Sequence, residues 1–308
     1  MSDAPRLGIA IVHYRSEELL RECLKRLRRS ALRDFVVCVV DNGSADGLTW
    51  VDGLDPRIAL VRNDSNRGFA AGVNAAVARL PATPWLLLLN PDVLLEDQAL
   101  ERVLDALEDD PTLGAAGCRL LLPDGRLDAA CRRADPDLAS SFTKQFGLDR
   151  LFPHSPRLGR YNLRGLDPER AHAIECGSGA FLMLRRDAFL AAGSLDERYF
   201  LYGEDLDLCR TLRSRGFGIR YVPEARALHV KGSGRVRAAA TTLHFYRAMW
   251  IYYRKWGRHR QNPLVLGALA LAATGLAMLE LARNVWRVSA PLPVPGLPSA
   301  GSVAAEPR

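Results

Sequence analysis

Short apolar runs alternate with segments of helical periodicity along the first third of the chain. Runs dominated by Val, Ile and Leu occur at 7–12, 35–40, 58–61 and 85–89. Runs of this length, bounded by polar turns, are typical of strands that are buried on both faces. Apolar residues spaced three and four apart predict helices after Ser16, which we expect to cap the first of them, from about 69 to 80, and from 97 to 108. The alternation predicts an α/β fold with an open, mostly parallel sheet and helices on both faces.

The pattern changes after residue 122. Prolines and arginines interrupt any periodicity from 123 to about 170, which indicates a long excursion over the site, and apolar runs return at 180–184 and 218–222. A helical, aromatic-rich segment follows Ala238, then an apolar run at 264–279, and five prolines fall within 291–308. We therefore expect two halves of one domain (1–122 and 123–236), a C-terminal helical extension (237–288) and a disordered tail (289–308).

Polar motifs follow several of these apolar runs. They are Asp41-Asn42-Gly43-Ser44, the string N-R-G-F-A-A-G-V-N at 66–74, Asn90-Pro91-Asp92, Glu204-Asp205, and His229-Val230-Lys231-Gly232-Ser233. In this order and at these intervals they resemble the inverting nucleotide-sugar glycosyltransferases of family 2, and among these the rhamnosyltransferase-like bacterial members that build cell-surface polysaccharide. The resemblance extends from about residue 7 to about residue 256. It implies a GT-A fold and a hexosyltransferase that uses a nucleotide-sugar donor and a saccharide or polyprenyl-linked acceptor.

By the resemblance, 1–122 is the nucleotide-sugar-binding half of the domain and 123–236 is its acceptor-side and catalytic half. The first three motifs are candidates for donor binding, the third through Asn90 and Asp92. Asp41 ends an apolar run, and its carboxylate can accept hydrogen bonds from a pyrimidine N–H or a ribose hydroxyl. The resemblance implies contact with the base. The alternative is that Asp41 is a turn residue that caps its own loop. Asn66, Arg67 and Gly68 open a helix, whose N-terminus suits an anion. The alternative for Gly68 is a tight packing joint between loop and helix.

The third and fifth motifs suggest a divalent cation, Mg²⁺ or Mn²⁺. The resemblance places Asn90-Pro91-Asp92 at the family's metal-binding D-x-D motif, with Asn90 in place of the first carboxylate. Asp92 alone is a poor site unless donor phosphates and another side chain complete it. His229 is the expected second ligand, although imidazole suits Mn²⁺ better than Mg²⁺, and a structural histidine is the alternative.

The Glu204-Asp205 pair is the candidate catalytic group. The family pattern places the catalytic aspartate second, so Asp205 is expected to be the base, with Glu204 orienting the acceptor or Asp205. Two adjacent carboxylates would also raise one pKa if partly buried, and helix capping is the alternative role. Asp207 has no assigned role. A further hypothesis concerns arginines that could bind a phosphorylated acceptor as a group: Arg132, Arg133, Arg150, Arg157, Arg160 and Arg164.

Charge and cysteine usage bear on the cell compartment. The net charge is +7, yet residues 225–279 hold nine cations and no carboxylate, so the excess lies in the C-terminal part. With the neighbouring aromatic residues and the apolar run 264–279, this favours an anionic membrane surface over nucleic acid. The run has 16 residues, short of the ~20 needed to span, so we expect a monotopic helix, with a buried helix as the alternative. Six cysteines without a C-x-x-C pair indicate a reducing cytosol. The expected location is cytoplasmic, peripheral or monotopic on the inner face of the cytoplasmic membrane.

Two other function classes are alternatives to a glycosyltransferase. A nucleotide-binding oxidoreductase needs G-x-G-x-x-G after the first strand, where this chain reads His13-Tyr14-Arg15-Ser16-Glu17. A non-catalytic nucleotide-sugar-binding or membrane scaffold protein would be favoured by loss of the Glu204-Asp205 pair, and the pair is present.

Overall fold

The structure, a computed structural model, describes residues 5–44, 48–136, 155, 160–231, 239–257, and 262–278 apart from 265, 269, 273 and 277. The strands are β1 (Leu7–His13), β2 (Phe35–Asp41), β3 (Ile58–Arg62), β4 (Trp85–Leu89), β5 (Val93–Leu95), β6 (Leu113–Leu121), β7 (His172–Ala173), β8 (Phe181–Arg185) and β9 (Gly218–His229). The helices are α1 (Glu17–Arg29), α2 (Phe69–Arg79), α3 (Ala99–Glu108), α6 (Arg186–Ala191), α7 (Glu204–Ser214) and α8 (Ala239–Trp256), with 3₁₀ turns at Thr49–Val51 and Ala129–Cys131.

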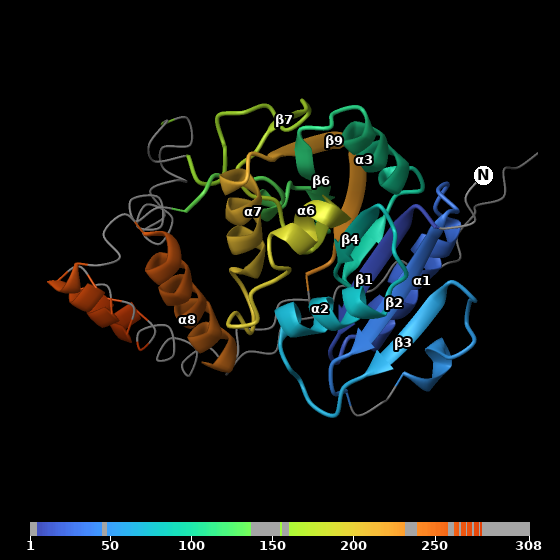
Figure 1. Ribbon diagram of the computed structural model, residues 1–308, viewed down its shortest axis with the longest axis horizontal. Helices are drawn as coiled ribbons and strands as arrows, with labels where there is room; N and C mark the ends of the chain where they lie inside the picture. Colours follow the sequence, from blue (N-terminus) through green and yellow to red (C-terminus); the bar gives the residue numbers. More distant parts are fainter. Residues whose placement is uncertain are drawn as a thin grey trace, which may run out of the picture.

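One sheet organises these elements (Figure 1). Its order is β3-β2-β1-β4-β8-β6-β9-β5, with β7 paired to β9. The strands β3, β2, β1 and β4 are mutually parallel, so their carboxyl ends meet at one edge, with His13 opposite Asp41. β8 then runs antiparallel to β4 and β6, whereas β9 is parallel to β6. The predicted fold class is confirmed, and the antiparallel strands make the second half of the sheet mixed.

The predicted helices form because their apolar faces cover the sheet. Leu20, Cys23, Leu24 and Leu27 of α1 are buried. α2 packs on β1 and β2, and its Gly72 allows the close approach, because a Cβ there would lie 2.7 Å from Val12. The expectation that Ser16 caps α1 with its side chain is wrong. Ser16 stands at the N-cap, but its hydroxyl contacts His13 Nδ1 at 3.1 Å instead of a backbone N–H.

The apolar patterns missed β5 and β6. β6 is rich in Gly and Ala, and Gly114 leaves room for Phe217, whose Cβ would lie 2.7 Å from a Cβ at that position. Part of the predicted excursion (137–154 and 156–159) and the whole predicted tail (289–308) lie outside the described residues. All six cysteines are buried and free, as the sequence indicates.

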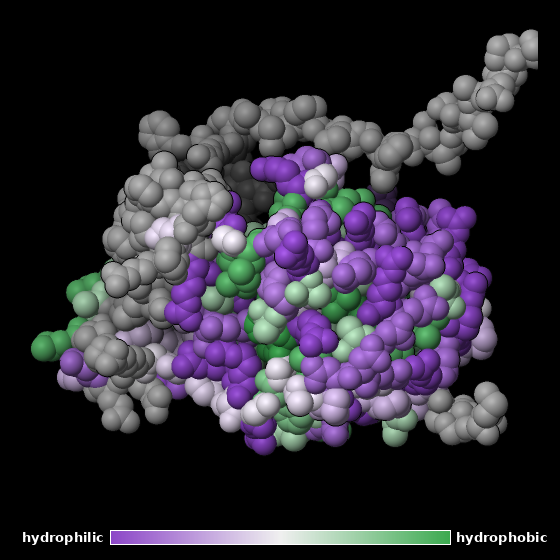
Figure 2. Space-filling view, turned by 90° about the horizontal axis from the view of Figure 1, so that it is seen from above, coloured by the Kyte–Doolittle hydropathy of each residue, from purple (hydrophilic) through white to green (hydrophobic). Residues whose placement is uncertain are grey.

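The C-terminal extension has two different parts. α8 lies beside α7 (Figure 1), with Ala248 and Tyr252 buried against Tyr199. The described residues of 262–278 are instead helical and largely exposed, with Leu264 at 83%, Leu271 at 77% and Met278 at 65%, and apolar residues stand out at this end of the molecule in Figure 2. The buried-helix alternative therefore does not describe these positions. Nowhere in the described part of the chain is a helix long and apolar enough to cross a membrane.

Candidate active site

Asp41 ends β2 at the carboxyl edge of the parallel strands and is buried. Its Oδ1 accepts a hydrogen bond from the Ser44 N–H at 2.9 Å. This is the loop-capping contact expected of a turn residue. It fixes the side chain at the strand end, where ligands of open α/β sheets bind.

Asn42 connects this turn to the loop before α2. Its Nδ2 donates to Asn66 Oδ1 and to the Gly68 carbonyl, each at 3.0 Å, and its Oδ1 accepts from Asn63 Nδ2 at 3.0 Å and from the Arg67 N–H at 3.2 Å. Asn66, Arg67 and Gly68 are thereby brought next to Asp41. The sequence analysis did not single out Asn42, although the D-N-G turn contains it.

Gly68 is a packing joint. Its φ of +87° is in the left-handed region, and a Cβ there would lie 2.5 Å from the Phe200 carbonyl oxygen. The Phe69 N–H donates to that same oxygen at 2.8 Å. One N–H at the start of α2 is thus bound by protein instead of being left for an anion. The joint holds the α2 loop against the segment that leads into α7.

Asp92 and His229 meet where β5 pairs with β9. Asp92 directly precedes β5, and His229 is the last residue of β9. Their side chains approach to 3.5 Å between Oδ1 and Nε2, and the Val230 N–H donates to the Asp92 carbonyl at 2.9 Å. Nδ1 of His229 lies 2.8 Å from Asp128 Oδ2, and Lys231 Nζ lies 2.8 Å from Asp128 Oδ1. The sequence analysis missed Asp128, which precedes the 3₁₀ turn at Ala129–Cys131 within the irregular segment.

Burial and neighbouring charges set the protonation of His229 and Asp128. Burial acts to lower the pKa of His229, but the bond to Asp128 and the approach of Asp92 outweigh it and raise the pKa to about 9. Burial of Asp128 is likewise outweighed by its bonds to His229 and Lys231, which hold the pKa of that carboxyl well below its usual range. Because ionised Asp128 can only accept, Nδ1 carries a proton. With a pKa of about 9, Nε2 is also protonated at neutral pH and faces Asp92, so a cation would have to displace that proton to bind there.

These residues fit a divalent cation as a partial site. Asp92 Oδ1 is buried and has no hydrogen-bond partner among the described residues. A carboxylate on the far ring nitrogen is the usual support of a metal-binding histidine. The described residues hold no group of three or more His, Cys, Asp or Glu placed to bind a metal, so Asp92 and His229 would be two ligands that the substrate completes. Asn90 is fixed beside them by its backbone, with its N–H bonded to the Ala180 carbonyl at 2.9 Å.

Asp205 is held by an arginine that the sequence analysis did not connect with it. Its Oδ2 accepts from Arg133 Nη2 at 2.7 Å and from the Gly179 N–H at 3.0 Å, and its Oδ1 accepts from the Leu206 N–H at 2.8 Å. The two side chains are only 10% and 13% exposed. Arg133 also donates to the Gly177 carbonyl. The guanidinium balances the Asp205 charge and fixes the direction of its carboxylate.

Glu204 is the other half of the pair and titrates differently from an ordinary glutamate. Burial, followed by the neighbouring Asp205 charge, raises the pKa of Glu204 to about 8. Its Oε2 is buried without a hydrogen-bond partner among the described residues. Gly203 is the N-cap of α7 and supplies no side-chain cap. Asp205 accepts from the Leu206 N–H in the first turn, so the capping alternative holds in part for Asp205, but it does not explain the burial of Glu204.

The hypothesis of an arginine cluster for a phosphorylated acceptor gains no support from Arg132, Arg133 or Arg160. Arg133 is paired with Asp205, Arg132 donates to the Leu166 carbonyl at 3.0 Å, and Arg160 lies 3.2 Å from Glu175. Arg150 and Arg157 lie outside the described residues. These three arginines are thus bound to protein groups.

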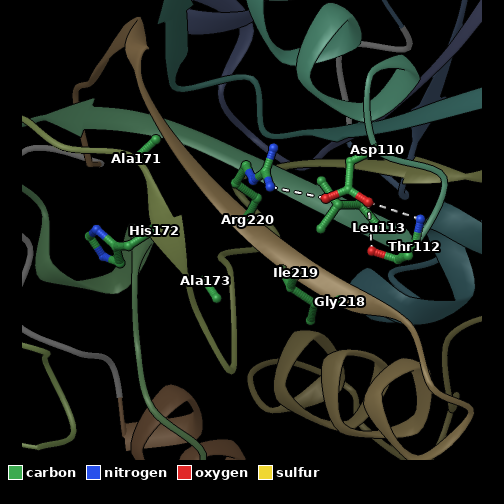
Figure 3. A pocket seen from close by; sticks show the side chains of 9 residues that line it. All are labelled: Asp110, Thr112, Leu113, Ala171, His172, Ala173, Gly218, Ile219 and Arg220. Atoms are coloured by element: carbon green, nitrogen blue, oxygen red, sulfur yellow. Dashed lines mark hydrogen bonds and ion pairs between the residues drawn. The ribbon is translucent and has the colours of Figure 1, made fainter.

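A cavity of about 490 Å³ lies elsewhere, where β7, β9 and the start of β6 meet (Figure 3). None of the candidate residues lines it. Its polar side chains bind one another: Asp110 lies 3.0 Å from Arg220 and accepts from Thr112 Oγ1 at 2.6 Å. We therefore place the candidate active site at the strand ends and not in this cavity.

Two solved structures share this fold. The crystal structure of GalNAc-T7 with UDP, GalNAc and Mn²⁺ has a similar fold, with a TM-score of 0.59 and 12% identity over 92% of this chain and 58% of that chain. The mannosyltransferase PcManGT from Pyrobaculum calidifontis, in complex with GDP-Man and Mn²⁺, has a TM-score of 0.57 and 19% identity over 94% of this chain and 77% of that chain. The fold is thus that of the GT-A glycosyltransferases.

The sequence places the chain within this class. Residues 8–190, more than half of its length, match Glycosyl transferase family 2, and the chain belongs to this family. It is similar to the N-acetylglucosaminyl-diphospho-decaprenol L-rhamnosyltransferase of Mycobacterium tuberculosis, with 28% identity over 90% of this chain and 95% of that protein. The predicted enzyme class is confirmed: the protein is a glycosyltransferase.

Proposed function

We propose that this enzyme moves a sugar from a nucleoside-diphosphate donor to a saccharide or lipid-linked acceptor, with inversion, in cell-surface polysaccharide synthesis. The observation that carries the proposal is the joint at Gly179–Ala180. The Gly179 N–H donates to Asp205, and the carbonyl of the following residue, Ala180, accepts from the Asn90 N–H. The candidate base and the candidate cation segment are thus fixed to adjacent residues of one loop, as displacement at a sugar carbon between them requires.

Each residue has a defined task in this proposal. Asp41 contacts the nucleoside, and the loop of Asn66, Arg67 and Gly68 borders the donor. Asp92 and His229 would hold Mg²⁺ or Mn²⁺, with Asn90 beside them; the cation would neutralise charge on the diphosphate leaving group. Asp205 accepts the proton of the acceptor hydroxyl.

The state of the acidic pair supports these roles. A buried carboxyl whose pKa is raised is typical of sites that carry out acid–base chemistry. Glu204, with its pKa near 8, keeps its proton at neutral pH. It then adds no second negative charge beside Asp205 and can donate a hydrogen bond, while Arg133 orients the base.

The relative from Mycobacterium tuberculosis supports a first choice of substrates. Its name describes transfer of L-rhamnose to a saccharide on decaprenyl diphosphate. We propose rhamnose as the first donor sugar to test and a polyprenyl-linked saccharide as the first acceptor.

A donor screen tests the proposed function. The purified chain is incubated with Mn²⁺ or Mg²⁺, a polyprenyl-linked saccharide and a panel of nucleotide sugars, and released nucleoside diphosphate is measured. Acceptor-dependent release from one donor, with an inverted anomeric configuration in the product, is the expected result. Retained configuration would contradict direct displacement, and no release from any donor would contradict the proposed reaction.

The C-terminal extension supports a membrane location for this reaction. α8 carries the exposed cations Arg247 and Arg254, and the apolar side chains of Leu264, Leu271 and Met278 are exposed beyond it. Cations beside exposed apolar helical residues suit an anionic lipid surface, which also holds the acceptor. We propose that the enzyme is peripheral or monotopic on the inner face of the cytoplasmic membrane.

A further inference from the structure

Asp207 faces the C-terminal helix α8. It lies in the first turn of α7, two residues after Asp205, and is only 3% exposed. Its Oδ2 accepts from Lys255 Nζ at 2.8 Å and its Oδ1 from Trp256 Nε1 at 2.7 Å. Both donors belong to the last turn of α8. Because a buried carboxylate is strongly unfavourable without such partners, Asp207 ties the end of α8 to the catalytic helix.

A second carboxylate joins the two helices. Asp135 accepts from the Tyr252 hydroxyl of α8 and lies 2.9 Å from Arg210 and 3.3 Å from Arg213 of α7. Arg210 also donates to the Trp256 carbonyl at 3.5 Å. The contact of α7 with α8 is therefore a specific polar interface around the apolar cluster of Tyr199, Ala248 and Tyr252.

α8 also supports the turn that leads into α7. Tyr202 and Gly203 have φ values of +71° and +86°, and a left-handed tyrosine persists only where its surroundings hold it. A Cβ at Gly203 would lie 3.4 Å from Ala248 of α8, and the Phe200 ring stacks on His244 of α8 at 4.3 Å. The direction in which Glu204 and Asp205 enter the site thus depends on α8.

We propose that Asp207 is a positioning residue for the candidate base: its contacts with Lys255 and Trp256 seat α8, and α8 fixes the turn and first helical turn that carry Asp205. This inference rests on the proposed function, because it assigns Asp207 an effect on transfer. It gives the basic, aromatic C-terminal helix a part in catalysis that is separate from membrane attachment.

The test uses the full chain with Asp207→Asn and Lys255→Met, with Lys255→Arg as the conservative change. Lys25→Met is the matched control, because it makes the same change at an exposed lysine of a different helix, α1. We expect the first two variants to lower kcat about 10- to 100-fold, as small misplacement of a reacting group does. The donor KM should stay within about twofold, since the candidate donor contacts lie on other elements. Lys255→Arg should keep most of the activity, and Lys25→Met should match the wild type.

Hydrogen exchange provides a readout that does not depend on activity. Backbone amides of 199–208 should exchange faster in Asp207→Asn and Lys255→Met than in the wild type or Lys25→Met, while the amides of β1 and β4 stay protected. Faster exchange with unchanged kcat would overturn the positioning role and leave the proposed function intact. Unchanged exchange would overturn the docking role of Asp207. A wild-type chain that transfers no sugar would instead overturn the proposed function, and the catalytic effect assigned to Asp207 with it.

Discussion

Replacement of Arg133 by Met should destabilise the fold through the charge that it leaves on Asp205. The two side chains are 10% and 13% exposed and 2.7 Å apart, so solvent screens the pair only weakly. Removing one partner of such a pair costs about 3–5 kcal/mol. Asp205 would keep its bonds from the Gly179 and Leu206 N–H groups, which places the expected loss in the free energy of unfolding at the lower end, about 3 kcal/mol.

Urea unfolding at neutral pH measures this loss. Asp205→Asn alone leaves the guanidinium buried, and in the double variant neither charge remains, so the double loss should be smaller than the sum by about 1–3 kcal/mol. Arg160→Met is the control, since its pair with Glu175 is largely exposed and should be worth no more than ~1 kcal/mol. Additive single losses, or a loss for Arg133→Met no larger than the control's, would refute the coupling.

Three further results are expected. Glu204→Gln should flatten the pH dependence of stability, because the buried carboxyl keeps its proton to about pH 8 whereas the unfolded chain loses it near 4.5. The wild-type melting temperature should therefore fall more steeply than the variant's as pH rises between these values. Parallel curves would count against a protonated Glu204. Asp128→Asn should weaken Mn²⁺ binding about 10- to 100-fold, measured by calorimetry in the presence of nucleotide. Asp124 is an exposed acid nearby, and Asp124→Asn should not change the affinity. Equal affinities for the two variants would remove Asp128 from the site. Truncation after Gln261 should reduce flotation with anionic vesicles, and high salt should release the intact chain only in part. Equal flotation of the truncated and the intact chain would show that 262–308 is not the anchor.

The fold could be predicted largely because burial fixes its patterns. β1, β2 and β4 are covered on both faces, so each is a continuous apolar run, and α1 shows one apolar stripe. β6 was missed because its close packing requires small residues, Gly114 and alanines, and these have a low propensity for strands. The antiparallel insertion of β8 also depends on pairing between distant segments, which periodicity does not report.

The candidate site could be predicted only where one segment carries its own signal. The motifs at Asp41, Asp92 and Asp205 stand at the ends of apolar runs or at the start of a helix. Asp128 and Arg133 lie in an irregular segment, and their partners are 101 and 72 residues away along the chain. Nothing in the local sequence distinguishes such residues from surface charges, and only the folded arrangement reveals them.

The measurement that tests the central claim most directly is the turnover of Asp205→Asn. The substitution preserves shape and removes proton affinity, so kcat should fall at least ~10²-fold while the affinity for the nucleotide sugar, measured separately by calorimetry, stays within about twofold. Turnover close to that of the wild type would show that Asp205 is not the base and would contradict the proposed mechanism.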